Sequence, residues 1–337
     1  MIRSSEVPHA MDFSSPPELN DTVREILDDL LNGDVRTLAR VITRVENRSP
    51  EGETLLRLLF SHTGKSRIIG ITGSPGAGKS SLVDRLAAHY LKEKKSLAIV
   101  AVDPSSPFTG GALLGDRIRM NAIAADPGVF IRSMATRGHL GGLAGATSDV
   151  VSVLDAAGRD PILIETVGVG QDEVDIVKLA DVSVVVLVPG MGDDIQALKA
   201  GIMEIGDIFV INKCDRPGVE KMERAVQSLL SLAHREDGWI PPIVKTVAIE
   251  ERGIDELARS IDLSFDHYRN TSARVGKRRE AGRQRLMGLL QERLVAKALE
   301  TLFPSDSLDR LLDRIAKRET DPYTIVDAIV RGARFEA

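Results

Sequence analysis

Residues 73–80 read Gly73-Ser74-Pro75-Gly76-Ala77-Gly78-Lys79-Ser80 and fit the phosphate-loop pattern G-x-x-x-x-G-K-[ST] without a mismatch. An apolar run over 67–72 precedes this segment and predicts a strand, and a helical pattern over 81–88 follows it. The glycines let backbone N–H groups turn onto phosphate oxygens, and the helix adds the positive end of its dipole. We therefore expect residues 73–81, Ser81 included, to bind a triphosphate. The alternative is a chance match in a glycine-rich turn, which these flanks disfavour.

A second segment bears on the choice of base. The apolar run 208–211 predicts a buried strand, and it leads into Asn212-Lys213-Cys214-Asp215, which resembles the N-K-x-D motif of GTPases. In that motif the Asp accepts hydrogen bonds from guanine N–H groups, which adenine does not offer in the same place. We expect Asp215 to select guanine, Lys213 to pack over the base and Asn212 to tie this loop to the phosphate loop. Val247 and Ala248 follow another apolar run, where GTPases carry a further base-contacting loop. A polar turn after a strand is the alternative.

Two acids follow predicted strands and point to magnesium. Asp103 ends the strand-like run 96–102, and Glu165 ends the run 161–164. Because parallel strands open on one crevice at their carboxyl ends, both acids should face the phosphates. Mg²⁺ takes hard oxygen ligands and keeps several waters, so these acids and the Ser80 hydroxyl suit it. Lys79, Asp103 and Glu165 are the predicted catalytic residues; a helix cap or a solvated loop is the alternative for either acid.

The segments beside these acids read as nucleotide-dependent switches. The glycine-bearing stretch 110–120 contains Asp116, which is either a further magnesium ligand or a helix N-cap. Residues 165–168 resemble the third GTPase motif, with Glu where Ras-like proteins have Asp. This resemblance implies that the Gly168 N–H meets the γ-phosphate, so loss of that phosphate would release the segment. Two residues separate Gly168 from Gln171, so the water-positioning role of the Ras-like Gln is not carried over to Gln171. We expect slow intrinsic hydrolysis that a partner stimulates.

Composition excludes several classes of function. The 337 residues carry a net charge of −5 with basic residues interleaved among acids, which argues against nucleic-acid binding. No run approaches the ~18 apolar residues of a membrane span, and no signal peptide is recognised at the start. One cysteine excludes an internal disulfide. The six histidines show no ligand spacing, and His139 reads best as a hydrogen-bonded loop residue. We expect a cytoplasmic protein.

Alternating strands and helices predict a doubly wound α/β fold. Short β-rich runs recur near residues 68, 97, 129, 162, 183, 208 and 243, with helical patterns between them. Such alternation predicts a mostly parallel sheet covered on both faces. We expect a mobile segment and helices over 1–62, a P-loop domain over 63–270 and a helical region over 271–337. The last region bears an apolar stripe, which packs either on the domain or on a second subunit: Leu286, Leu290, Leu294, Ala298 and Leu302.

Taken together, the phosphate loop, 103–106, 134–143 and 165–171 resemble the MeaB/ArgK family, which lies within the SIMIBI group of P-loop GTPases. The human relative is the MMAA protein. The resemblance covers roughly 20–335 and implies a GTPase chaperone of adenosylcobalamin-dependent acyl-CoA mutases that gates cofactor loading and protects the mutase. It also implies a homodimer through the C-terminal helices. Segment 190–200 resembles the third switch of this family; an ordinary loop capped by Asp193 or Asp194 is the alternative.

Other functions stay open at this stage. The chain could be an ATP-using kinase of a small substrate, although a kinase has no need of a guanine motif. It could be a nickel- or zinc-insertion GTPase, which the absence of a Cys/His cluster disfavours. It could also be a nucleotide-gated scaffold with negligible turnover. No residue indicates which mutase would be the client.

Overall fold

The computed structural model describes residues 21–103, 121–135, 142–166, 179–190, 206–232, 235, 237–269, 272–302 and 307–332. Three of the predicted site residues lie wholly or partly outside this set. Asp116 and Gly168 fall in segments that are not described, and only the backbone of Asp103 is described. The possible third switch, apart from Gly190, lies outside it as well.

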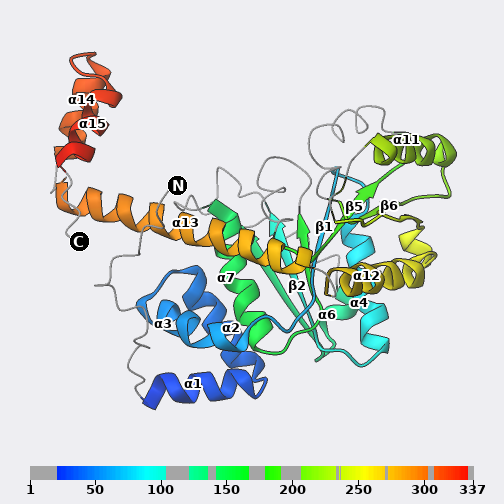
Figure 1. The fold of residues 1–337 in the computed structure, drawn as a ribbon. Coiled ribbons are helices and arrows are strands. Elements are labelled where there is room, and N and C mark those ends of the chain that lie inside the picture. Colours follow the sequence, from blue (N-terminus) through cyan, green and yellow to red (C-terminus); the bar gives the residue numbers. More distant parts are fainter. Residues whose placement is uncertain are drawn as a thin grey trace, which may run out of the picture. The chain divides into compact units, whose positions relative to one another are not determined.

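Seven parallel strands form one sheet in the order β3-β2-β4-β1-β5-β6-β7 (Figure 1). This confirms the predicted parallel sheet, and each of the seven β-rich runs supplies one strand. All six residues of β5 are buried, which suits a central strand that is apolar except for Ser183. The strands are β1 (Ile68–Gly73), β2 (Leu97–Asp103), β3 (Val129–Ala135), β4 (Ile162–Thr166), β5 (Val182–Leu187), β6 (Ile208–Ile211) and β7 (Ile243–Lys245).

The strand order determines what lies beside the phosphate loop. Strand β1 is central and pairs with β4 on one side and β5 on the other. The chain passes from β1 to β2 and β3, returns through β4, and then builds outward on the opposite side of β1. A loop that follows β1 therefore opens where the winding direction changes, which is the usual ligand position in such sheets. Ile71 pairs with Glu165 in this register, so the acid at the end of β4 lies close to the loop.

Helices cover both faces of the sheet. On one face α4 (Lys79–Lys92) and α12 (Ile254–Arg269) share a core with β1, β5 and β6. On the other face α1 (Asp21–Leu31), α2 (Val35–Glu46), α3 (Pro50–Leu59) and α7 (Gly142–Ala156) pack on β2 and β4 (Figure 1). Helix α11 (Val219–Leu232) packs on β6. The shorter elements are η1 (Phe60–His62), α6 (Asn121–Ala124) and η3 (Ala248–Glu250). The N-terminal helices are thus continuous with the core of the α/β fold.

Carboxylates hold the amino ends of the strands. Asp155, at the end of α7, is 4% exposed and accepts hydrogen bonds from three successive backbone N–H groups just before β1. The Ser66 N–H bond measures 2.9 Å and the Lys65 bond 3.1 Å. Asp160 and Asp181 accept from the next two N–H groups, those of Arg67 and Ile68. The chain is therefore fixed where it starts the central strand.

A second group of side chains surrounds Asp207, just before β6. Its fully buried carboxylate accepts from the Ser183 N–H at 2.9 Å, from the Tyr268 hydroxyl at 2.6 Å and from Arg235 Nη2 at 3.1 Å. Lys277 Nζ lies 3.1 Å from the same carboxylate and 3.9 Å from the centre of the Tyr268 ring. Burial and the nearby Asp207 charge raise the pKa of Tyr268. We call these groups, with Asp237, the Asp207 cluster.

The chain divides into two compact units between Arg285 and Leu286, within α13 (Ser272–Leu302). The boundaries at 62 and 270 stay predictions. Two further helices follow, α14 (Ser307–Ala316) and α15 (Pro322–Gly332). Asp321 caps α15 as its sequence suggests, accepting from the Thr324 N–H at 2.9 Å. Leucines of the predicted stripe on α13 are exposed, namely Leu286, Leu290 and Leu294, and so is Leu299 beside the stripe. Among the described residues, no helix has the length and apolar character that crossing a bilayer requires.

Candidate functional site

The phosphate loop follows β1 with a backbone that only glycine adopts readily. Gly73, Gly76 and Gly78 have φ values of 141°, 77° and 89°, and α4 begins directly after Gly78. A Cβ at Gly73 would lie 2.1 Å from the carbonyl oxygen of Val186, and one at Gly78 would lie 2.5 Å from Nδ2 of Asn212. Glycine is therefore required at position 73 by the neighbouring strand β5 and at position 78 by the side chain of Asn212, in addition to the backbone conformation of the loop.

Lys79 lies over this loop. It is 5% exposed, and its Nζ donates to the carbonyl oxygen of Gly73 at 2.6 Å and to that of Ser74 at 3.1 Å. A buried ammonium requires such acceptors, because a charge moved from water into the interior without them costs several kcal/mol even after the protein relaxes. The arrangement holds a positive charge where the N-terminus of α4 opens, and this position suits an anionic ligand.

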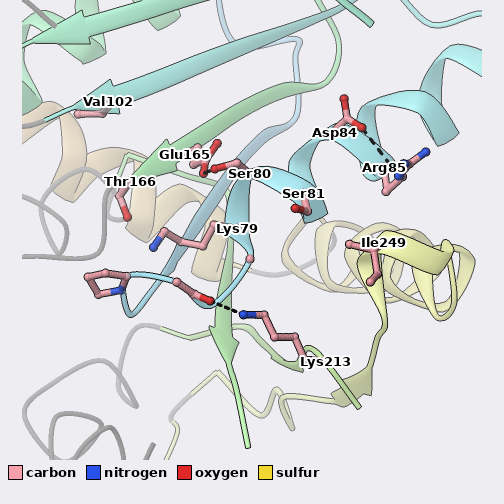
Figure 2. Close-up of a pocket in the computed structure, with 13 residues that line it drawn as sticks. Lys79, Ser80, Ser81, Asp84, Arg85, Val102, Glu165, Thr166, Lys213 and Ile249 are labelled. Carbon is pink, nitrogen blue, oxygen red and sulfur yellow. Dashed lines mark hydrogen bonds and ion pairs between the residues drawn. The ribbon is translucent and has the colours of Figure 1, made fainter. Parts of the chain in front are cut away.

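A cavity of about 650 Å³ opens at the carboxyl edge of the sheet. This volume falls in the usual range for small-molecule sites. Figure 2 shows Lys79, Ser80 and Glu165 gathered on one side of it and Lys213 and Ile249 on another. Eight of the predicted residues line it: Pro75, Gly76, Gly78, Lys79, Ser80, Ser81, Glu165 and Lys213.

Ser80 and Glu165 are brought together by two elements far apart in sequence. Ser80 is the second residue of α4, and its Oγ donates to Glu165 Oε1 at 2.6 Å. Glu165 is only 5% exposed. A hydroxyl and a carboxylate in contact form the hard oxygen pair that Mg²⁺ prefers, so this site fits the ion. The backbone of Asp103 ends β2, which pairs with β4, so its position agrees with the predicted acid edge.

The predicted base motif is tied to the phosphate loop by Asn212. Its Nδ2 donates to the Ala77 carbonyl oxygen at 2.9 Å, while its Oδ1 accepts from Thr246 Oγ1 at 3.0 Å and from the Ala248 N–H at 3.2 Å. One buried amide therefore holds three loops in fixed relation. Its neighbour Lys213 donates to the Gly76 carbonyl oxygen at 2.7 Å (Figure 2).

The remaining base residues lie around this junction. Asp215 is exposed, whereas Val247 and Ala248 are buried at 3% and 2% exposure. None of these three lines the cavity itself. Cys214, inside the motif, donates its thiol to the Ile211 carbonyl oxygen at 2.8 Å, and burial raises the pKa of that thiol. The thiolate form is therefore disfavoured, and Cys214 acts as a small packing residue.

Five further residues line the cavity that the sequence analysis did not assign to the site: Asp84, Arg85, Val102, Thr166 and Ile249. Ile249 directly follows Val247 and Ala248 and is 73% exposed, which is unusual for a large apolar side chain beside a site. Asp84 lies four residues after Ser80 in a helix, so helical spacing alone could have placed both on one face.

The Asp84 carboxyl group is partly buried beside the cavity. Burial raises the pKa of its carboxyl group, while Arg85 lowers it and Glu251 adds to the rise. Its Oδ1 is buried with no hydrogen-bond partner among the residues that the structure describes. Buried polar atoms without a partner are rare, because each costs about 1–3 kcal/mol.

Comparison with protein families supports a nucleotide site. Residues 38–302 match the family model described as methylmalonyl Co-A mutase-associated GTPase MeaB. A protein of Pyrococcus abyssi named as a GTPase is 46% identical over 92% of this chain and 96% of its own length. The GTPase ArgK of Escherichia coli is 35% identical over 86% of this chain and 88% of its own.

Two further matches bear on fold and on relatives outside bacteria and archaea. A mitochondrial protein of Caenorhabditis elegans named methylmalonic aciduria type A homolog is 34% identical over 71% of this chain and 65% of its own length. The solved structure described as an LAO/AO transport system kinase covers 93% of this chain and 98% of its own, with a TM-score of 0.66 and 27% identity. The α/β P-loop fold is thus shared along nearly the whole chain.

Proposed function

Because the chain belongs to the MeaB family of GTPases, we propose that it times the loading of adenosylcobalamin into an acyl-CoA mutase and protects that mutase from inactivation. The observation that carries this proposal is the match of residues 38–302 to a family described as mutase-associated. The relative named for methylmalonic aciduria supports the same client class. Methylmalonyl-CoA mutase or a close relative such as 2-hydroxyisobutyryl-CoA mutase is the proposed partner.

The guanine nucleotide belongs in the cavity at the carboxyl edge. In the proposed complex, the backbone of 73–81 binds the phosphates, and Lys79 moves from its loop carbonyls onto the β- and γ-phosphates. The Lys213 stem lies over the base, and the exposed Asp215 carboxylate accepts from the guanine ring. Val247 and Ala248 close the base side, with Asn212 fixing their distance from the phosphate loop.

Magnesium is proposed beside the phosphates. Ser80 and Glu165 would hold it directly or through water, with Asp103 and Asp116 as further candidates. When bound, the ion neutralises charge on the β- and γ-phosphates during hydrolysis. The chain's own part is to donate from Lys79 to the same oxygens and to keep the Glu165 carboxylate buried and oriented.

We propose that loss of the γ-phosphate releases the segment containing Gly168, and that the mutase reads this change through 110–120, 134–143 and 190–200. A cytoplasmic homodimer is the proposed assembly. The exposed leucines of α13 support it, because an apolar stripe of this length is usually covered in the working protein. Hydrolysis is expected to be slow until the mutase is bound.

Phosphate release from GTP, measured with and without each candidate mutase, tests this proposal. We expect one of the methylmalonyl-, isobutyryl-, ethylmalonyl- and 2-hydroxyisobutyryl-CoA mutases to form a complex with the chain and to accelerate hydrolysis. Transfer of adenosylcobalamin to that mutase should then depend on the nucleotide. Failure of all four mutases to bind would overturn the chaperone proposal. Binding without turnover would instead indicate a nucleotide-gated scaffold.

The kinase alternative has one observation in its favour, the description of the solved relative as a transport system kinase. Labelled GTP and ATP separate the two, because an Asp215 contact requires a guanine donor. Equal affinities for both nucleotides would remove the basis of the guanine assignment. For nickel or zinc insertion, the residues that the structure describes contain no group of three or more His, Cys, Asp or Glu side chains placed to hold a metal ion.

A further inference from the structure

Asp84 is an acid of the cavity with a buried carboxylate oxygen that has no hydrogen-bond partner among the described residues. It lines the same cavity as Lys79, Ser80 and Glu165, and its side chain is 15% exposed. Its Oδ1 is fully buried and has no hydrogen-bond partner in the described part of the chain. The other oxygen, Oδ2, lies 3.8 Å from Arg85 Nε, which is a long contact.

The local structure does not account for this residue. Asp84 is the sixth residue of α4, beyond the first turn whose free N–H groups a carboxylate would cap. Its neighbour Arg85 is directed elsewhere, since Arg85 Nη1 binds Glu251 Oε1 at 2.8 Å (Figure 2 shows the Asp84–Arg85 pair beside the site). A buried oxygen without a partner lowers stability by about 1–3 kcal/mol. The position is therefore unfavourable for folding alone.

The spacing from Ser80 relates Asp84 to the proposed ion. Residues four apart on a helix have Cβ atoms about 5–6 Å apart. Ser80 and Asp84 therefore lie on the same side of α4, and a water bound to an ion at Ser80 can lie between them. Mg²⁺ dehydrates reluctantly and keeps several waters, and each of these waters donates hydrogen bonds to nearby acceptors. The Asp84 carboxylate lines the cavity and is such an acceptor.

We propose that Asp84 is a positioning residue that accepts a hydrogen bond from a water of the magnesium shell. The inference rests on the magnesium site of the proposed function. It does not depend on the mutase. Asp84 acts through the water and thereby fixes the ion relative to Ser80 and Glu165. Partners of this kind outside the direct ligands commonly raise metal affinity about 10–100-fold.

The test compares metal and nucleotide binding in Asp84→Asn and Asp84→Ala. Mn²⁺ binding to the GDP complex is followed by electron paramagnetic resonance, with Mg²⁺ as competitor. We expect metal affinity to fall about 10-fold in Asp84→Asn and up to about 100-fold in Asp84→Ala. GDP affinity in EDTA should stay at the wild-type value. Asp255→Asn is the matched control, because this 83% exposed acid contacts α4 only through His89.

Stability supplies the second readout. Because each variant removes a buried charge without a full set of partners, urea unfolding should show stability equal to or above wild type. Unchanged metal affinity in both variants would overturn the role of Asp84. A variant that loses stability and GDP affinity equally, with or without metal, would show a structural role instead. If the GDP affinity of wild type is the same with and without the metal ion, both the magnesium site and this inference are overturned.

Discussion

The two ends of the central sheet use the same residue type for opposite purposes. At the amino ends, Asp155 and Asp207 are buried and fully surrounded by donors from the backbone, Arg235 and Tyr268. At the carboxyl ends, Asp84 keeps an oxygen without a donor. A carboxylate whose partners all come from the chain stabilises the fold. A carboxylate that lacks such partners among the described residues is available to a ligand.

This difference predicts that ligand binding and folding stability can be reduced separately, by substitutions at opposite ends of the strands. Changes at the carboxyl ends should lower nucleotide or metal binding and leave unfolding nearly unchanged. Changes at the amino ends should lower the free energy of unfolding and leave nucleotide affinity of the folded protein nearly unchanged. The following substitutions test each half of this statement.

The largest effect is expected for Lys79→Ala. Removing a buried charge that contacts phosphate costs about 2–5 kcal/mol, so GTP affinity should fall roughly 1,000-fold. Isothermal titration with GTP and GDP measures it. The control is Lys92→Ala on the same helix, where the lysine is 74% exposed and 3.7 Å from Glu251. Wild-type affinity in the Lys79 variant would refute the assignment of the phosphate loop.

The counterpart at the amino ends is Asp207→Ala. It leaves Arg235 and Lys277 without their shared carboxylate, and breaking such a buried group costs about 3–5 kcal/mol. Urea unfolding should show this loss, while GDP affinity measured well below the unfolding transition should match wild type. The 83% exposed Asp255 is a control acid for which Ala should have little effect. A drop in nucleotide affinity without a drop in stability would contradict the separation of the two ends.

A smaller effect is expected for Asp215→Asn. The exposed carboxylate becomes an amide, which donates to the 2-oxo group of xanthine and keeps only one acceptor oxygen for the guanine N–H groups. Loss of one such pairing is worth about 1–3 kcal/mol, so GTP affinity should fall roughly 10–100-fold while xanthosine triphosphate affinity rises. Competition between the two nucleotides measures the change. If the preference for GTP stays intact, the base assignment is wrong.

The contrast also explains what the sequence could predict. Local sequence patterns encode the seven strands and the phosphate loop. Because parallel strands open on one crevice at their carboxyl ends, Glu165 was expected near the phosphate loop, and its carboxylate contacts Ser80 there. Ile249 was missed because its relation to the cavity arises only when η3 lies at the edge where α4 begins. Asp84 was missed although its helical spacing from Ser80 could have indicated it. Arg235 carries no local signal for its pairing with Asp207, which precedes it by 28 residues. Tertiary proximity, more than residue type, decides these roles.

The smallest predicted effect concerns acid stability at the amino ends. Burial alone would raise the pKa of Asp237, but bonds from Arg235 at 2.7 Å and the Trp239 N–H at 3.0 Å lower it to about 2. A carboxyl group with a lowered folded pKa stabilises the protein above its unfolded pKa, near 3.8, and loses that contribution as pH falls toward 2. Wild type should therefore be more stable than Asp237→Asn at pH 7.

Urea midpoints for both proteins between pH 7 and pH 2.5 measure this difference. The difference in urea midpoint between wild type and variant should stay constant down to about pH 4. It should become smaller below that pH, because protonation of Asp237 then makes the wild type resemble the variant. The GDP affinity of the variant at pH 7 should equal that of wild type, since Asp237 contacts only groups at the amino ends. A gap that does not change with pH would mean that Asp237 acts by shape alone and that its charge contributes nothing there.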